Sequence, residues 1–182
     1  MNDRNRILYT VDNPIKQKFV MGKYIMSDPD YSKFAALLIS TKLLDNKYID
    51  QTTKDTIPQL RFLNEATAWT GFIPSNAAMT EAELAGIIPS NTDTLKLFLQ
   101  YHFIRKNAIC DDGLVSGVFP SQRIESVSAI EGTKYATLQV TNAKDNMTVT
   151  DHSGQVVAVD HSTANHLTRK GVAHKINHVL KY

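Results

Sequence analysis

The sequence predicts an α+β domain, because helical spacing of apolar residues dominates its first half and short alternating runs dominate its second half. Hydrophobic residues make up 42% of the 182-residue chain and charged residues 21%, which is typical of a folded globular protein. A chain of this length buries a substantial core and is short for two domains. We therefore expect one domain, with helices first and antiparallel strands after them.

Three helix starts lie in the first part of the chain. Residues 27–30 (Ser-Asp-Pro-Asp) supply a capping oxygen, a proline in the first turn and acids near the positive end of the helix dipole. Apolar side chains follow at helical spacing from Tyr31 to Leu44, which predicts a core helix. A second helix is expected to begin at residues 74–76 and a third at residues 90–93.

Five strands are expected after the last helix, where apolar and polar residues alternate over short stretches. They are expected at residues 124–130, 134–142, 147–151, 155–160 and 172–180. Turn signals such as Glu131-Gly132 and Ser153-Gly154 separate these runs. This order of elements favours an α+β domain over a doubly wound α/β domain.

The charge and hydropathy of the chain argue against several classes of protein. A formal net charge of +2 is too small to indicate binding to nucleic acid or to an anionic membrane. The longest apolar run, residues 34–39, is too short to span a bilayer. The first six residues lack the apolar stretch of a signal peptide, so we expect either a cytoplasmic protein or a domain excised from a longer exported one.

Motifs of known catalytic sites do not occur in the sequence, which has no GxSxG elbow, phosphate-binding glycine loop, CxxC pair or HExxH helix. Cys110 is the single cysteine, and the neighbouring carboxylates of Asp111 and Asp112 raise the pKa of a thiol instead of lowering it. An acid–base enzyme needs only two residues that meet in the fold. The absence of motifs is therefore weak support for a non-enzymatic protein.

Histidines are concentrated near the C-terminal end, so a zinc site is one interpretation. Five of the six follow residue 150: His152, His161, His166, His174 and His178. His174 and His178 would share one face of a helix, but the alternation from Val172 to Leu180 predicts a strand, on which they lie about 13 Å apart. This favours structural or surface histidines, and we assign no metal ligand and no cofactor.

Four segments, taken in order, resemble the sequence motifs of the fasciclin (FAS1) family. Residues 70–79, TGFIPSNAAM, are similar to its first motif, a strand followed by Pro-Ser-Asn and a helix. Tyr101-His102, in LKLFLQYHFI, resembles its tyrosine–histidine motif. Residues 156–166, VVAVDHSTANH, take the place of its valine-rich strand and Asp-Ile loop. Residues 170–180, KGVAHKINHVL, resemble its closing motif.

The resemblance extends over about residues 15–181 and implies a FAS1 fold, in which N-terminal helices pack against a mostly antiparallel β-sheet wedge of about seven strands. It implies that residues 1–182 are a single domain excised from a longer exported protein. A looser similarity to tandem-fasciclin lipoproteins of Bacteroidetes envelopes implies an expected location outside the cytoplasm, at the cell surface or anchored to the outer membrane through a segment absent from this chain. The expected partners are proteins or glycans on a cell or matrix surface and neighbouring FAS1 domains.

Most residues at the family's motif positions are expected to maintain the fold. They are Pro74, Ser75, Asn76, Tyr101, His102, Asp160, Gly171 and His174. Pro74 ends a strand at a helix entry, Ser75 or Asn76 caps that helix, and Gly171 suits a turn that needs a permissive backbone. Tyr101 and His102 are expected to be partly buried, and His174 to be a neutral, hydrogen-bonded ring.

The chain departs from the family pattern at several motif positions. His161 follows Asp160 where the family has isoleucine, and Lys170 precedes Gly171 where the family has asparagine. Animal members use segments near the Tyr-His and Asp-Ile motifs for integrin adhesion, and these departures argue against the same role here. His161 and Trp69, the single tryptophan, are kept as candidate binding residues, with core packing favoured for Trp69.

The sequence therefore predicts a non-enzymatic cell-adhesion or surface-binding module of the cell envelope. Two alternatives stay open. A structural spacer in a tandem array needs no ligand surface, whereas contiguous exposed apolar surface favours adhesion. A His-dependent hydrolase or metal-binding protein needs a cleft that joins two or more of His152, His161 and His166 with a carboxylate.

Overall fold

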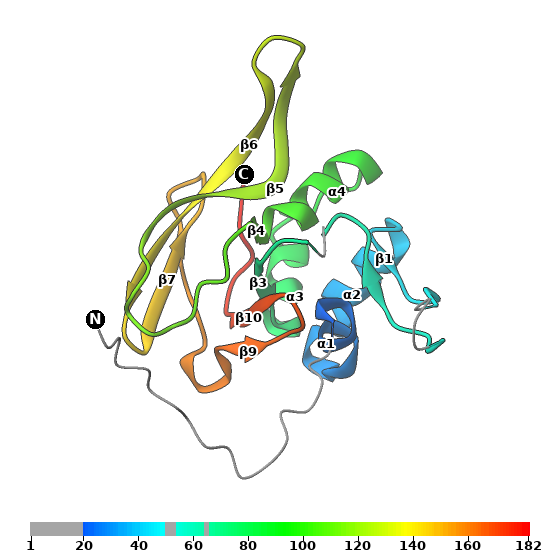
Figure 1. Ribbon diagram of the computed structural model, residues 1–182, viewed down its shortest axis with the longest axis horizontal. Helices are drawn as coiled ribbons and strands as arrows, with labels where there is room; N and C mark the ends of the chain where they lie inside the picture. Colours follow the sequence, from blue (N-terminus) through cyan, green and yellow to red (C-terminus); the bar gives the residue numbers. More distant parts are fainter. Residues whose placement is uncertain (1–19, 50–53, 64–65) are drawn as a thin grey trace, which may run out of the picture.

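A computed structural model describes residues 20–49, 54–63 and 66–182 (Figure 1). It confirms the predicted α+β class, with helices packed on one side of a large, mostly antiparallel sheet. The expected start of the domain core near residue 15, and the first six residues, lie outside the described residues. Within the described part, no helix is both long and apolar enough to cross a membrane.

The helices of the described chain include the three that the sequence predicts. They are α1 (Met21–Ser27), η1 (Pro29–Tyr31), α2 (Ser32–Ser40), α3 (Asn76–Leu84), α4 (Thr92–Tyr101) and η2 (His161–Thr163), where η marks a short 3-10 helix. The predicted starts are confirmed as η1–α2, α3 and α4, and the side chains of Asp28, Ser75 and Asn91 cap them. Helix α2 ends at Ser40 instead of continuing to residue 44, because Lys42 adopts a left-handed conformation with φ of 60°.

Helix α1 has no counterpart among the predicted elements. No side chain caps it at Val20 and no acidic residue lies in its first turn, so it lacks the usual helix-start signals. Its buried face includes Met21, Tyr24 and Ile25, which join the core beneath the helices. Burial of this face, and not its local sequence, stabilises the helix.

The strands form a two-stranded sheet and an eight-stranded sheet. They are β1 (Leu44–Asp45), β2 (Gln59–Leu60), β3 (Trp69–Pro74), β4 (Phe103–Arg105), β5 (Gly117–Ser128), β6 (Gly132–Ala143), β7 (Asn146–Thr150), β8 (Val156–Ala158), β9 (His166–Leu167) and β10 (Gly171–Ile176). The large sheet has the order β8-β7-β6-β5-β4-β3-β10-β9, and among these described strands only β3 and β10 run parallel. The last predicted strand ends at Ile176 and not at residue 180, so His178 lies beyond it.

The large sheet curls back on itself just after β8. Val159 forms an antiparallel bridge with Ile176, and the N–H of Asp160 donates to the carbonyl of Lys175 at 2.8 Å. These contacts bring the chain after β8 against the far end of β10. The result is the wedge expected from the resemblance.

Two hydrophobic cores lie on opposite faces of β3 and β10, because successive side chains of a strand point to opposite sides. Ile73 and Ala173 belong to the core under the helices. Phe72 and Ile176 belong to the core inside the curled sheet. Figure 1 shows the helices on one side of β3 and β10, with β6 and β7 on the other.

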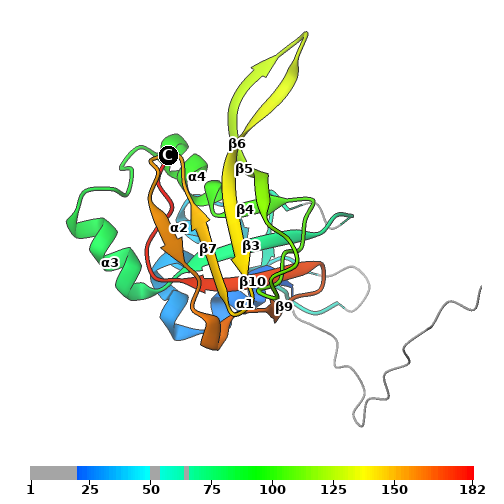
Figure 2. The ribbon, with the colours of Figure 1, turned by 90° about the vertical axis from the view of Figure 1, so that its left-hand side faces the viewer.

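The longest strands, β5 and β6, form a hairpin that projects from the body of the molecule (Figures 1 and 2). Near its root, Ser121 pairs with Ile104 of β4, and residues 139–143 pair with β7. Farther out, residues 124–135 pair across the hairpin, and no other described strand flanks them. We call residues 124–135 the arm.

Candidate functional site

The first family motif connects β3, α3 and the start of α2. Pro74 is the last residue of β3, and the hydroxyl of Ser75 caps α3 through a 3.2 Å hydrogen bond. Asn76 lies inside the helix and bonds to another element instead. Its side-chain oxygen accepts from the N–H of Lys33 (3.0 Å), and its NH2 group donates to the carbonyl of Pro29 (2.9 Å). Asn76 therefore holds α3 against the N-terminus of α2.

Replacing Asn76 by alanine is expected to destabilise the domain by about 1–2 kcal/mol, because Lys33 N–H and the Pro29 carbonyl lose their partner. The midpoint of thermal unfolding should fall by about 2–8 °C. The control is Asn177→Ala, because Asn177 is exposed and its side chain forms no hydrogen bond of this kind among the described residues. This variant should change stability by less than about 0.5 kcal/mol. Equal melting of the two variants would contradict this role of Asn76.

Tyr101 and His102 lie where α4 ends, and both are fully buried. The hydroxyl of Tyr101 donates to the carbonyl of Thr137 (3.0 Å) and accepts from the N–H of His152 (2.9 Å). Burial raises the pKa of this hydroxyl above its ordinary value. Tyr101 therefore ties α4 to β6 and to the loop after β7.

Both ring nitrogens of His102 bond to the backbone. Nδ1 donates to the carbonyl of Phe98 (3.0 Å), and Nε2 accepts from the N–H of Leu180 (3.1 Å). Only a neutral ring can donate at one nitrogen and accept at the other. Burial accordingly lowers the pKa of His102 to about 4. The side chain joins α4 to the C-terminal segment of the chain.

His174, in β10, has the same kind of environment. Its Nε2 donates to the carbonyl of Ile109 (2.8 Å), and its Nδ1 accepts from the N–H of Asn165 (3.3 Å). Burial lowers the pKa of this histidine too. The ring of His174 thus connects β10 with the loop that contains Ile109 and with the loop that contains Asn165.

Gly171 is required for a reason other than the expected turn. It is the first residue of β10 and pairs with Trp69 of β3, and its φ lies outside the left-handed region. A Cβ atom at this position would lie 2.0 Å from the carbonyl oxygen of Trp69. The close approach of two parallel strands therefore demands a residue without a side chain.

Asp160 and His161 lie at the start of η2 and have different environments. The carboxylate of Asp160 accepts from the hydroxyl of Ser162 (2.6 Å), which lowers the pKa of Asp160. His161 is half exposed; its Nδ1 lies 3.0 Å from a carboxylate oxygen of the buried Asp111, and its Nε2 lies 3.7 Å from the carboxylate of Asp145. Among the residues that the structure describes, no group of three or more His, Cys, Asp or Glu side chains is arranged to hold a metal ion.

The remaining C-terminal histidines contact different partners. His152 stacks on Tyr182 with ring centres 4.5 Å apart, and His166 stacks on Tyr24 at 3.8 Å. Nδ1 of His178 lies 3.0 Å from the carboxylate of Glu81 in α3. Each of these histidines is thus engaged by its own neighbour.

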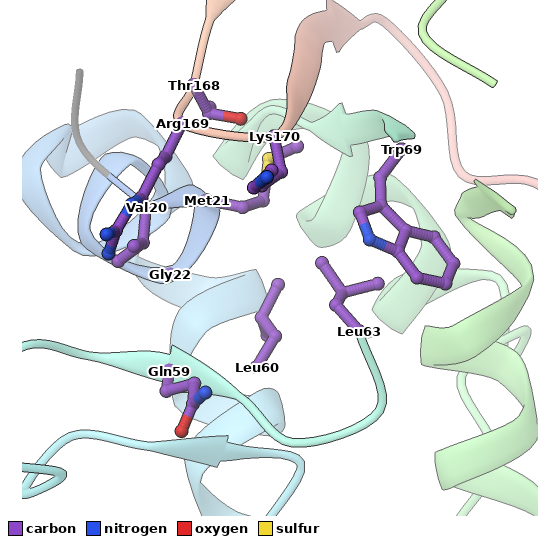
Figure 3. Close-up of a pocket in the computed structure, with 10 residues that line it drawn as sticks. All are labelled: Val20, Met21, Gly22, Gln59, Leu60, Leu63, Trp69, Thr168, Arg169 and Lys170. Atoms are coloured by element: carbon purple, nitrogen blue, oxygen red, sulfur yellow. The ribbon is translucent and has the colours of Figure 1, made fainter. Parts of the chain in front are cut away.

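Trp69 forms part of the wall of a hollow between α1, β2 and the turn from β9 to β10 (Figure 3). The hollow has an empty volume of about 430 Å³, which includes solvent at its mouth. Its apolar lining and basic border come from Met21, Leu60, Leu63, Trp69, Arg169 and Lys170. Figure 3 shows the ring of Trp69 turned toward Leu63. Since Trp69 is almost fully buried, its ring is a wall of this hollow and not an exposed platform. We call it the Trp69 hollow.

The tip of the arm carries exposed apolar side chains that the sequence analysis did not single out. Val127 is 74% exposed and Ile130 is 95% exposed. The hydroxyl of Ser128 accepts from the N–H groups of Ile130 and Glu131, each at 3.2 Å, which closes the turn. The sequence placed Ile130 at the end of a strand, whereas the structure places it in the turn, where polar residues are usual.

Comparison with known proteins agrees with the fold. The family model of the fasciclin domain matches residues 29–182, so this chain belongs to the fasciclin family. Fasciclin domains are associated with cell adhesion and are generally not enzymes. A similar solved structure is a FAS1 domain pair from the insect cell adhesion molecule fasciclin I, with 15% identity, a TM-score of 0.48, and coverage of 83% of this chain and 45% of that chain. This chain thus spans less than half of that domain pair. No curated protein sequence matches it.

Proposed function

We propose that this fasciclin domain is a non-enzymatic adhesion or surface-binding module, and that the tip of the arm is its contact element. The observation that carries the proposal is the exposure of two aliphatic side chains, Val127 and Ile130, at the far end of a projecting hairpin. Full burial of such a side chain by a partner stabilises a contact by about 1.5–3 kcal/mol. An element that extends beyond the body meets an approaching surface first.

The root of the arm is braced, which supports a role in recognition. The guanidinium of Arg123 lies 3.8 Å from the ring centre of Tyr182, whose hydroxyl donates to Glu125 at 2.7 Å. Glu125 also forms a 2.7 Å ion pair with Lys134 on the opposite strand. A contact element that is already ordered loses less conformational freedom when it binds.

The state of the buried histidines supports a non-enzymatic function. Backbone groups occupy both ring nitrogens of His102 and of His174, so neither ring offers a nitrogen for proton transfer to a substrate. His161 and His178 each have a carboxylate at hydrogen-bonding distance and a partly exposed ring. They keep the hydrolase alternative open to a direct assay.

The cellular context is also a proposal. Family membership supports a position outside the cytoplasm, in a longer exported protein in which residues 1–182 form one domain beside other fasciclin domains. Anchoring as an outer-membrane lipoprotein, through a segment outside this chain, fits the same context. The partners are then proteins or glycans of a cell or matrix surface, and no cofactor is needed.

The proposal is tested by screening the domain on glycan and extracellular-matrix arrays, with and without a metal chelator. The variant Ile130→Asp should bind at least about tenfold more weakly than the wild type, because it replaces the apolar contact with a charge that resists desolvation. The control is Leu84→Asp, since Leu84 is 86% exposed on α3, outside the arm. Binding by the control should equal that of the wild type.

Other outcomes separate the alternatives. Wild-type binding that survives in Ile130→Asp would refute the arm tip as the contact element. A wild type that binds to none of the arrayed surfaces would favour the alternative of a structural spacer in a tandem array. Binding that disappears with chelator would favour a histidine metal site.

A further inference from the structure

We infer that the arm tip of one copy docks into the Trp69 hollow of a second copy of this chain, so that the domain associates head to tail. This inference rests on the proposed function, because it names the partner of the same contact element. The two surfaces belong to one sequence and have complementary charge, with a carboxylate beside the tip and basic side chains beside the hollow. The tip is a projecting apolar knob, and the hollow is an apolar recess with a basic border.

The chemistry of the tip is apolar with an adjacent negative charge. Ile130 projects from the turn, and Glu131 is exposed next to it. The bonds from both backbone N–H groups to the Ser128 hydroxyl fix this turn. Ile130 and Glu131 are therefore presented together by a preformed structure.

The chemistry of the hollow is the complement of the tip. Leu60, Leu63 and Trp69 provide apolar walls for an aliphatic side chain. Lys170 borders the hollow, next to Arg169 in the turn from β9 to β10, and is exposed. With the Ile130 side chain in the recess, the carboxylate of Glu131 would lie at the basic border, where opposite charges attract.

The positions of the two surfaces exclude contact within one copy. Figures 1 and 2 show the arm projecting at one end of the molecule, whereas α1 and β9, which flank the hollow, lie toward the other end. The contact therefore joins different patches of two copies, which is a heterologous interface. Such an interface leaves one free tip and one free hollow on every pair, so assembly continues into short chains unless the geometry closes a ring.

A single turn inserted into a small recess buries much less surface than a stable dimer interface of about 1,600 Å². We therefore expect weak association of the isolated domain, on the order of a micromolar to millimolar dissociation constant. Domains held close together on a surface or in one chain would associate more readily, because tethering raises their effective concentration.

The test combines sedimentation of the isolated chain with fluorescence of its single tryptophan. Trp69 is the only tryptophan in the sequence, so its emission reports directly on the hollow. The average mass should rise with protein concentration, and the emission of Trp69 should shift over the same range. Ile130→Asp should weaken association at least about tenfold and remove the concentration-dependent shift.

Charge reversal tests the orientation. Glu131→Lys and Lys170→Glu should each weaken association about fivefold, and the double variant should recover most of the lost affinity, because the two charges are again opposite.

A mixture of two variants provides a second test. Ile130→Asp keeps an intact hollow, and Arg169→Glu with Lys170→Glu keeps an intact tip, so together they should form one-to-one pairs that do not grow further. Unchanged far-ultraviolet circular dichroism and melting confirm that each variant is folded.

Three results would overturn the inference: a wild-type chain that stays monomeric up to millimolar concentration, association that Ile130→Asp leaves unchanged, or charge-reversal effects that simply add in the double variant. Failure of this inference can be distinguished from failure of the proposed function. A monomeric wild type whose binding to an array still depends on Ile130 would leave the contact element in place and assign it a different partner.

Discussion

The variant Gly171→Ala is expected to lose at least about 4 kcal/mol of folding stability and to melt about 8–16 °C below the wild type. The added Cβ atom would lie 2.0 Å from the carbonyl oxygen of Trp69 and 2.9 Å from its carbonyl carbon. These are backbone atoms of the adjacent parallel strand, so no side chain can rotate to make room. Relief requires β3 and β10 to separate, although both are buried between the two cores.

A matched glycine separates the clash from the general effect of adding a methyl group. A Cβ at Gly86 meets no heavy atom within 4 Å, although its φ of +67° makes alanine unfavourable there. Gly86→Ala should therefore cost only about 1–2 kcal/mol, from the left-handed backbone alone. The measurement is thermal and denaturant unfolding of both variants. A Gly171→Ala protein that melts with the wild type would show that the strands are farther apart than the structure indicates.

The case of Gly171 shows what the sequence could and could not predict. The resemblance to the family identified the position, and a glycine there could be read as a turn residue. The physical requirement is set by Trp69, more than a hundred positions earlier in the chain, because the two residues are paired in the sheet. Local patterns carry no information about such a partner.

The helices and strands were predicted where local signals exist. Side-chain caps such as Ser75 mark the start of a helix, and alternation marks strands such as β6. Helix α1 lacks these signals and depends on tertiary burial, so it was missed. The predicted strand over residues 172–180 was too long, because the chain leaves the sheet after Ile176 and alternation alone does not show where pairing stops.

The arm is a product of neighbouring strand lengths. The sequence predicted two strands joined by a turn near Gly132, and that hairpin is present. Its projection follows because β4 has 3 residues and β7 has 5, whereas β5 and β6 each have 12. Length differences between paired strands emerge only when the sheet order is known. The apolar tip, and the hollow assembled from segments distant in sequence, could not be located before the fold.

The largest effect of pH is expected from His102. Its neutral ring bonds to Phe98 and Leu180, and its pKa in the folded protein is lowered to about 4, compared with about 6.5 in an unfolded chain. The unfolded state therefore binds the proton first as the pH falls. The stability that His102 contributes is fully present above pH 6.5 and is lost as the pH falls toward 4, by on the order of 3 kcal/mol. His174, whose pKa is also lowered, acts in the same direction.

Two variants of His102 separate its packing from its titration. His102→Ala removes a ring that packs against Phe34 and Phe98 and leaves two buried backbone groups without partners, so it should cost about 3–5 kcal/mol at pH 7. His102→Gln keeps an acceptor that can reach the N–H of Leu180 but cannot titrate. At pH 7 this variant should lose about 2 kcal/mol of stability, which is less than His102→Ala loses. It should also flatten the pH dependence of stability between pH 6.5 and 4.

Urea unfolding of the wild type and of His102→Gln, repeated from pH 7.5 to 4, provides the measurement. The difference in unfolding free energy between the two proteins should shrink as the pH falls, because only the wild type must give up its neutral ring. Parallel curves would mean that His102 takes up its proton at the same pH in the folded and unfolded states, so that the folded ring would be charged below about pH 6.5 and could not accept from the Leu180 N–H there. Convergence of the curves would establish that His102 joins α4 to the C-terminal segment through an uncharged ring. An exposed His102 with a role in binding would not produce such convergence.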